Sequence, residues 1–138
     1  MIARLAAAAL SLSALAACAS TPADTPSPSG VPDYRAALVK PCANAADWSP
    51  WWLTDAWDDG QIEKSDAQFR ADGVMIYAYD GRTYDNGRWS LDGSTLHFDT
   101  NNHYADYDGA FDGDGASGVI RNVDGDAGKW TLARDCKP

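Results

Sequence analysis

Asp-Gly dipeptides recur along the chain from residue 59 and mark turns that follow one another about every eight to twelve residues, and this spacing limits the possible folds. Aspartate bonds to its own backbone in turns, and glycine adopts positive φ without strain. No helical period is sustained between these turns. The spacing therefore predicts an all-β antiparallel meander, either a sandwich or a barrel. The dipeptides begin at Asp59, Asp72, Asp80, Asp92, Asp108, Asp112, Asp114 and Asp124.

The segments between the turns have the composition of strands. They are rich in β-branched and aromatic residues or alternate polar with apolar ones, which places Trp89 and Trp130 toward the interior. About six to eight strands of ordinary length fit this part of the chain. We expect a small antiparallel meander barrel, because closure leaves no edge strand exposed. The expected strands cover residues 74–79, 88–91, 95–99, 104–111 with an interruption at Asp108-Gly109, 118–123 and 129–133.

Residues 1–17 have the pattern of an export signal. A basic start at Arg4 precedes an apolar run from residue 5 to 16, which is shorter than the roughly 20 residues that span a bilayer. The run ends in Leu-Ala-Ala-Cys at 15–18, which resembles the lipobox of bacterial lipoproteins. The resemblance implies cleavage before Cys18 and lipidation of Cys18 with acyl chains such as palmitate. The residue after Cys18 is Ala19 and not an aspartate, so the resemblance also implies an outer-membrane location, facing the periplasm or the surface. An ordinary secretory signal with a chance cysteine is the alternative.

The remaining chain divides into a tether and one domain. Residues 18–33 hold the lipidated cysteine and a Pro/Ser/Thr-rich stretch that cannot form a core. In an extended form this tether spans up to roughly 45 Å. Residues 34–138 are predicted to form the barrel domain. It begins with a short helix over residues 34–39, which Asp33 caps and Pro41 ends.

Two cysteines remain for the folded domain. Cys42 and Cys136 lie 94 residues apart, near the two ends of the domain. An exported protein meets an oxidising compartment, and a redox-active pair would be closely spaced as in Cys-x-x-Cys. We therefore predict a structural disulfide, which requires the first and last elements to lie side by side.

The later half of the chain shows a second resemblance. The Gly-Arg-Trp segment at 87–89, followed by Leu-His-Phe at 96–98, resembles the Gly-x-Trp strand and hairpin of calycin-like small barrels. Residues 118–122 and 125–132 repeat this glycine and tryptophan placement. The resemblance covers roughly residues 48–135. It implies a lipocalin-like or avidin-like barrel, a group that often binds small molecules in the barrel interior. Several small periplasmic barrels instead inhibit proteases or lysozyme.

Composition excludes several function classes. The formal charge is −9, from 20 acidic and 11 basic residues, and it becomes −10 once Arg4 leaves with the signal. Such a field repels phosphate backbones, so no nucleic acid is expected as a partner. The sequence lacks Gly-x-Ser-x-Gly, and turn chemistry accounts for most of the aspartates, so no enzyme activity is predicted.

Metal and cofactor binding are not predicted either. The domain has only two histidines, which leaves little room for a multi-histidine metal centre. Residues 106–109 and 112–115 place oxygens at alternate positions, as calcium prefers. However, neither segment belongs to a twelve-residue loop ending in glutamate, so solvated turn acids are the favoured interpretation. No cofactor motif is present.

Aromatic residues are the candidate binding residues. Four tryptophans lie within ten residues, which is more than one strand buries on one face, so we expect some in the core and at least one in a contact surface. A polar-aromatic stretch around residue 103 forms either the mouth of the barrel or an ordinary turn of residues that tolerate the left-handed region. The candidates are Trp48, Trp51, Trp52, Trp57, His103, Tyr104 and Tyr107.

These observations favour a lipid-anchored, non-enzymatic binding domain of the bacterial cell envelope. Its expected partners are the membrane, through the N-terminal lipid, and a small molecule or an envelope protein. The first alternative is an inhibitor of an envelope or secreted hydrolase, such as a protease or lysozyme, whose basic cleft the negative charge would attract. A hydrolase is the second alternative.

Overall fold

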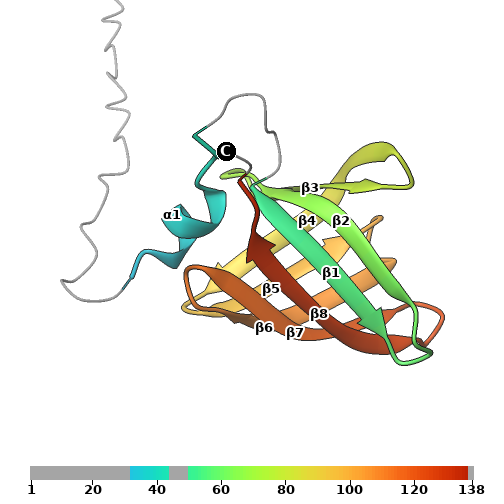
Figure 1. The fold of residues 1–138 in the computed structure, drawn as a ribbon. Helices are drawn as coiled ribbons and strands as arrows, with labels where there is room; N and C mark the ends of the chain where they lie inside the picture. The colour runs from blue at the N-terminus through green and yellow to red at the C-terminus, as the bar shows by residue number, and fades with distance from the viewer. Residues whose placement is uncertain (1–31, 44–49, 137–138) are drawn as a thin grey trace, which may run out of the picture.

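The computed structural model describes residues 32–43 and 50–136 (Figure 1). Within these residues the chain forms one short helix and eight strands, so the predicted all-β class is confirmed. The elements are α1 (Tyr34–Val39), β1 (Trp51–Trp57), β2 (Ile62–Phe69), β3 (Val74–Tyr79), β4 (Arg82–Asp92), β5 (Thr95–Thr100), β6 (Ala105–Phe111), β7 (Gly115–Asn122) and β8 (Ala127–Arg134).

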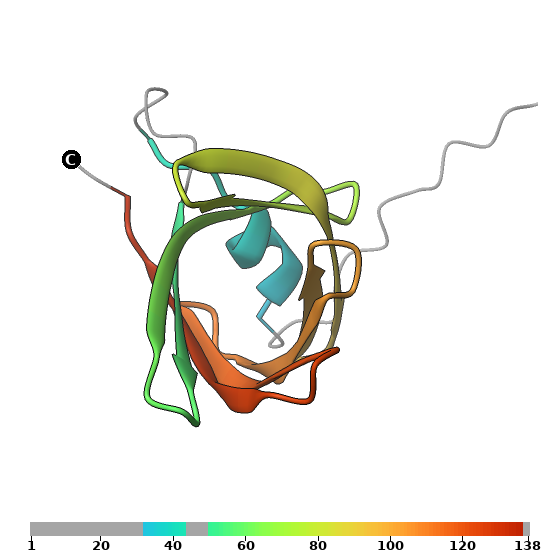
Figure 2. The ribbon, with the colours of Figure 1, turned by 90° about the vertical axis from the view of Figure 1, so that its right-hand side faces the viewer.

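The eight strands form a closed antiparallel barrel in which each strand pairs with its neighbours in sequence. Closure comes from β1 and β8, where Leu53 lies opposite Leu132. Figure 2 looks along the barrel and shows the strands as a ring, with α1 at the far end. The turn glycines have the expected left-handed conformation, with φ of 85° at Gly73 and 93° at Gly125. The predicted meander barrel is thus confirmed.

The expected interruption at Asp108-Gly109 is wrong, because β6 runs through both residues. Gly109 lies opposite Gly118 of β7. A Cβ atom at position 109 would lie 2.5 Å from the Trp130 ring. Gly109 therefore leaves space for an indole inside the barrel, and this close packing, not a turn, explains the glycine.

Aromatic side chains fill the middle of the barrel. Phe98 lies among them, with its ring centroid 4.2 Å from that of Tyr107, 5.0 Å from that of Trp130 and 5.5 Å from that of Phe69. Trp89 packs edge-on against Phe69. Trp89 and Trp130 are both buried, so their predicted inward orientation is confirmed.

Helix α1 covers one end of the barrel (Figures 1 and 2). The Asp33 carboxylate accepts a hydrogen bond from the Ala36 amide, as the predicted N-cap requires. Leu38 is fully buried, and its carbonyl accepts a bond from the Trp51 indole at 2.8 Å. The Arg35 guanidinium lies over the Trp89 ring at 4.5 Å. These contacts close this end of the barrel.

The predicted disulfide between Cys42 and Cys136 is confirmed, with 5.3 Å between the two Cα atoms. It joins the segment after α1 to the segment after β8. Nearby, the Arg134 guanidinium donates to the Lys40 carbonyl at 2.8 Å. The two ends of the domain are therefore held together covalently and by polar contacts.

Some sequence-based expectations lie outside the described residues. These are the signal at 1–17, the lipidated Cys18, most of the tether at 18–33 and the candidate Trp48. Among the residues that the structure does describe, no helix is both long enough and apolar enough to cross a membrane.

Candidate functional site

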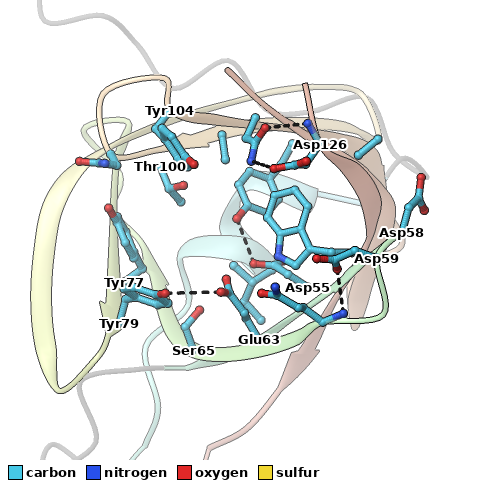
Figure 3. A pocket seen from close by; sticks show the side chains of 18 of the residues that line it. Asp55, Asp58, Asp59, Glu63, Ser65, Tyr77, Tyr79, Thr100, Tyr104 and Asp126 are labelled. Atoms are coloured by element: carbon cyan, nitrogen blue, oxygen red, sulfur yellow. Dashed lines mark hydrogen bonds between the residues drawn. The ribbon is translucent and has the colours of Figure 1, made fainter. Parts of the chain in front are cut away.

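The end of the barrel opposite α1 contains a cavity of about 720 Å³ (Figure 3). Its wall and rim come from the strands and from the loops β1–β2, β5–β6 and β7–β8. It is lined by Leu53, Asp55, Trp57, Asp58, Asp59, Gln61, Glu63, Ser65, Tyr77, Tyr79, Tyr84, Thr100, Asn101, Tyr104, Ala105, Tyr107, Asn122, Gly125, Asp126 and Ala127. A cavity of this size accommodates a small organic molecule.

Asp55 and Tyr107 form a polar pair deep in this cavity. The Tyr107 hydroxyl donates to Asp55 Oδ2 at 3.0 Å. A side-chain hydrogen bond with Thr100 acts in the opposite direction to burial and lowers the pKa of Tyr107. Because the Tyr107 ring stacks on Phe98, the aromatic core supports this pair from below.

Asp55 keeps one oxygen without a partner among the described residues. Its side chain is buried, with 6% of the residue exposed, and no described group hydrogen-bonds to Oδ1. An unsatisfied buried oxygen costs about 1–3 kcal/mol, and more when it carries charge. Since Asp55 lines the cavity, a bound molecule with a hydrogen-bond donor can satisfy Oδ1.

Burial raises the pKa of Asp55 to about 7. Desolvation is the main cause, the bond from Tyr107 opposes it, and the nearby carboxylate of Glu63 adds a smaller increase. The pKa of the Tyr107 hydroxyl is also raised, first by burial and then by Asp55. Asp55 thus changes between its neutral and charged forms near neutral pH, while Tyr107 stays protonated.

Stability is expected to fall as the pH rises from about 4 to above 7. In this range folded Asp55 keeps a proton that the unfolded chain has released, so folding becomes less favourable as pH increases. Asp55→Asn should remove this loss and stabilise the domain at pH 8 by up to about 4 kcal/mol. Urea unfolding at pH 5 and pH 8 measures the effect.

Asp92→Asn is the matched control, because it removes the same charge from an exposed position at the end of β4. It should keep the pH slope of the wild-type protein. If the stability of Asp55→Asn changed with pH as steeply as that of the wild type, Asp55 would not be the source of the pH dependence.

Tyrosines form much of the cavity wall. Tyr77 and Tyr84 stack with their ring centroids 5.3 Å apart, and the Tyr77 hydroxyl donates to Asn86 Oδ1 at 3.0 Å. The Tyr104 hydroxyl donates to Asp124 Oδ2 at 2.7 Å. These bonds fix the direction of the rings, so the wall is preorganised.

Acidic residues surround the opening. Asp58, Asp59, Glu63 and Asp126 line the cavity in addition to Asp55, and among its described lining residues there is no Lys, Arg or His. The Asp59 carboxylate also accepts a hydrogen bond from the Gln61 backbone amide at 2.9 Å, so this acidic residue stabilises a turn, as expected from the sequence. Glu63 accepts from the Tyr79 hydroxyl at 3.4 Å. The rim is therefore a region of negative potential.

The structure brings three of the candidate binding residues together. Trp57, Tyr104 and Tyr107 line the cavity, whereas Trp51 is fully buried at the α1 end and belongs to the core. Trp51 is thus not part of a contact surface, because its position at the start of β1 places it under the helix.

The remaining described candidates lie outside the cavity lining. Trp52 is half-buried, at a position that alternates with the inward Trp51 and Leu53. The side chain of His103 is 69% exposed and lies 3.4 Å from Asp99 and from Asp106. Asn101, Asn102 and His103 all have positive φ, as expected for the turn interpretation.

The sequence analysis did not identify Asp55 as a candidate site residue. A signal was present in the sequence, because Trp51, Leu53 and Asp55 alternate along one strand and so share its inward face. A carboxylate at an inward position of a barrel strand is a site candidate. Among the described residues, no group of three or more His, Cys, Asp or Glu side chains is arranged to hold a metal ion.

No protein-family model and no curated protein matches the sequence. The chain is similar to the solved structure of a redesigned β-barrel, with a TM-score of 0.47 and 20% sequence identity. The match covers 73% of this chain and 96% of the designed one.

Proposed function

We propose that the barrel is a non-enzymatic binding domain that holds a small molecule in its open end. One observation carries the proposal, namely the cavity of about 720 Å³ above a packed aromatic core. Its volume, its aromatic wall and its few buried polar groups are typical of ligand sites. The buried oxygen of Asp55 supports the same function, because a ligand donor would satisfy it.

The N-terminal pattern supports a proposed location. In this proposal Cys18 carries lipid and residues 18–33 tether the domain to the bacterial cell envelope, in the outer membrane. Several acyl chains at about 0.8 kcal/mol per buried methylene make such an anchor effectively permanent. The calycin-like resemblance around Trp89 fits a barrel that binds its ligand inside.

Cys18→Ser is expected to move the protein out of the membrane fraction or to leave its signal uncleaved. The substitution removes the thiol that would receive the lipid. Membrane fractionation with a labelled fatty acid measures the result. A variant that still carried the label and stayed with the membranes would exclude the lipobox interpretation.

A pair of serine-to-tryptophan variants tests whether the cavity binds a ligand. Ser65 lines the cavity, so Ser65→Trp should fill part of it. Ser117 and Val119 are exposed on β7 and alternate with half-buried Gly118 and buried Ile120, so Ser117→Trp adds the same side chain outside the barrel. Small molecules that copurify with the full-length protein from bacterial envelopes can be extracted and identified by mass spectrometry.

A molecule enriched with wild type and Ser117→Trp but lost from Ser65→Trp supports the proposal. Equal recovery from all three proteins places any binding outside the cavity and contradicts it. Hydrolase inhibition is the second candidate function, favoured by the exposed acidic residues Asp58 and Asp59 at the rim. Inhibition of lysozyme or a protease that survives Ser65→Trp would support this alternative.

A further inference from the structure

We propose that the ligand is a small organic cation, an ammonium carried on an apolar or aromatic body, with Asp55 as its counter-ion. This inference rests on the proposed function, since it names the chemical class that the same cavity takes. Three features of the cavity lead to it.

The first feature is the free oxygen of Asp55. Tyr107 already occupies Oδ2, whereas Oδ1 is buried in the cavity lining without a described partner. An ammonium group donates several hydrogen bonds, and it carries the positive charge that would neutralise the Asp55 carboxylate. An anionic ligand would add a second negative charge at this point and is disfavoured.

The second feature is the sign of the charges around Asp55. Glu63 of β2 lies directly opposite Asp55 in the strand pairing. Figure 3 shows both carboxylates beside the same pocket. Tyr107 approaches from β6, and β8 places the uncharged Trp130 opposite Asp55. No described cationic side chain lines the cavity to neutralise these acids, so a ligand is the available source of positive charge.

The third feature is the aromatic wall. Trp57, Tyr77, Tyr84 and Tyr104 line the cavity. The faces of such rings attract cations, and their carbon atoms bury apolar surface of a ligand. Together with a carboxylate at the bottom, these rings match a molecule that has one charged end and an apolar body.

The charge state of Asp55 makes the binding pH-dependent. Its pKa of about 7 means that much of the carboxyl is protonated at pH 6, and a cation gains most from the charged form. Binding should therefore strengthen as the pH rises through 7. Glu63, Asp58, Asp59 and Asp126 line the same cavity and add to the attraction of a cation.

Three probes of similar shape but different charge test the inference. They are 2-phenylethylammonium, the neutral 2-phenylethanol and the anionic 3-phenylpropanoate, titrated into the full-length protein and followed by calorimetry and by tryptophan fluorescence. We expect the ammonium to bind at least about tenfold more tightly than the alcohol at pH 8, with no detectable binding of the anion. Its affinity should fall by about tenfold between pH 8 and pH 5.5.

Asp55→Asn and Asp92→Asn provide the matched pair of variants. Asp55→Asn retains the side-chain shape and should reduce the preference for the ammonium to within about twofold, while binding of the alcohol persists. Asp92→Asn should behave as the wild type, because Asp92 is exposed and outside the cavity lining. Persistence of the full preference in Asp55→Asn would assign it to other groups and overturn the role of Asp55.

The outcomes separate the two proposals. Binding of the alcohol as tightly as the ammonium, with both lost in Ser65→Trp, would keep the cavity as a ligand site but overturn the cationic ligand. Binding of none of the three probes would overturn the small-molecule function together with this inference.

Discussion

Trp130→Ala is expected to lower the free energy of unfolding by about 3–5 kcal/mol, the range for an aromatic residue removed from a packed core. Trp130 is 1% exposed, and its ring packs edge-on against Phe98 and Tyr107. Its indole donates to the Val119 carbonyl at 3.0 Å, so truncation also removes a part-buried hydrogen bond. Because Gly109 leaves the space that the ring fills, no side chain at that position can close the resulting gap.

Urea unfolding of the wild type, Trp130→Ala and Trp52→Ala measures the loss. Trp52 is the matched control, because it is half-buried and follows the inward Trp51 on β1. Its removal should cost about 1 kcal/mol or less. Similar losses for the two variants would contradict the assignment of Trp130 to the core. Trp130→Ala should also weaken ligand binding, since Trp130 supports Tyr107 at the floor of the cavity.

The barrel could be predicted because turn chemistry and strand alternation act locally. The left-handed conformation at Gly73 and Gly125 depends on a few residues, and so does the alternation that buries Trp89 and Trp130. Gly109 shows the limit of this reasoning. Its role depends on Trp130 and Gly118, which lie on other strands, and the sequence around Gly109 carries no sign of either.

The candidate site could be predicted only in part for the same reason. The polar-aromatic surroundings of Tyr104 and Tyr107 left a barrel mouth and an ordinary turn as alternatives, and the structure places both residues in the cavity lining. Trp51 and Trp57 have similar sequence surroundings, yet one is buried beneath α1 and the other lines the cavity, because they stand at opposite ends of β1. The site depends on which end of the barrel the helix covers, and that is decided by contacts between distant segments such as the one from Arg35 to the Ala71 carbonyl.

Removing the disulfide is expected to cost about 4–5 kcal/mol, according to the chain-entropy model for a loop of this length. Cys42 and Cys136 are separated by 94 positions in the sequence, and every strand of the barrel lies between them. The cost arises mainly because the unfolded chain without the bond has many more conformations. The folded barrel itself is closed by hydrogen bonds between β1 and β8, which do not require the bond.

The double variant Cys42→Ser and Cys136→Ser should therefore fold to the same barrel but unfold at lower urea concentration. Its m-value should rise, since its unfolded state exposes more surface than the cross-linked one. Reduction of the wild-type protein should reproduce the loss, which controls for the serine side chains. Because the bond and Arg134 both fasten the segment after α1 to the end of β8, the variant should also expose Trp51 to a fluorescence quencher before the barrel unfolds. Unchanged stability in the double variant would contradict the chain-entropy estimate, and the disulfide would then contribute little to the stability of the domain.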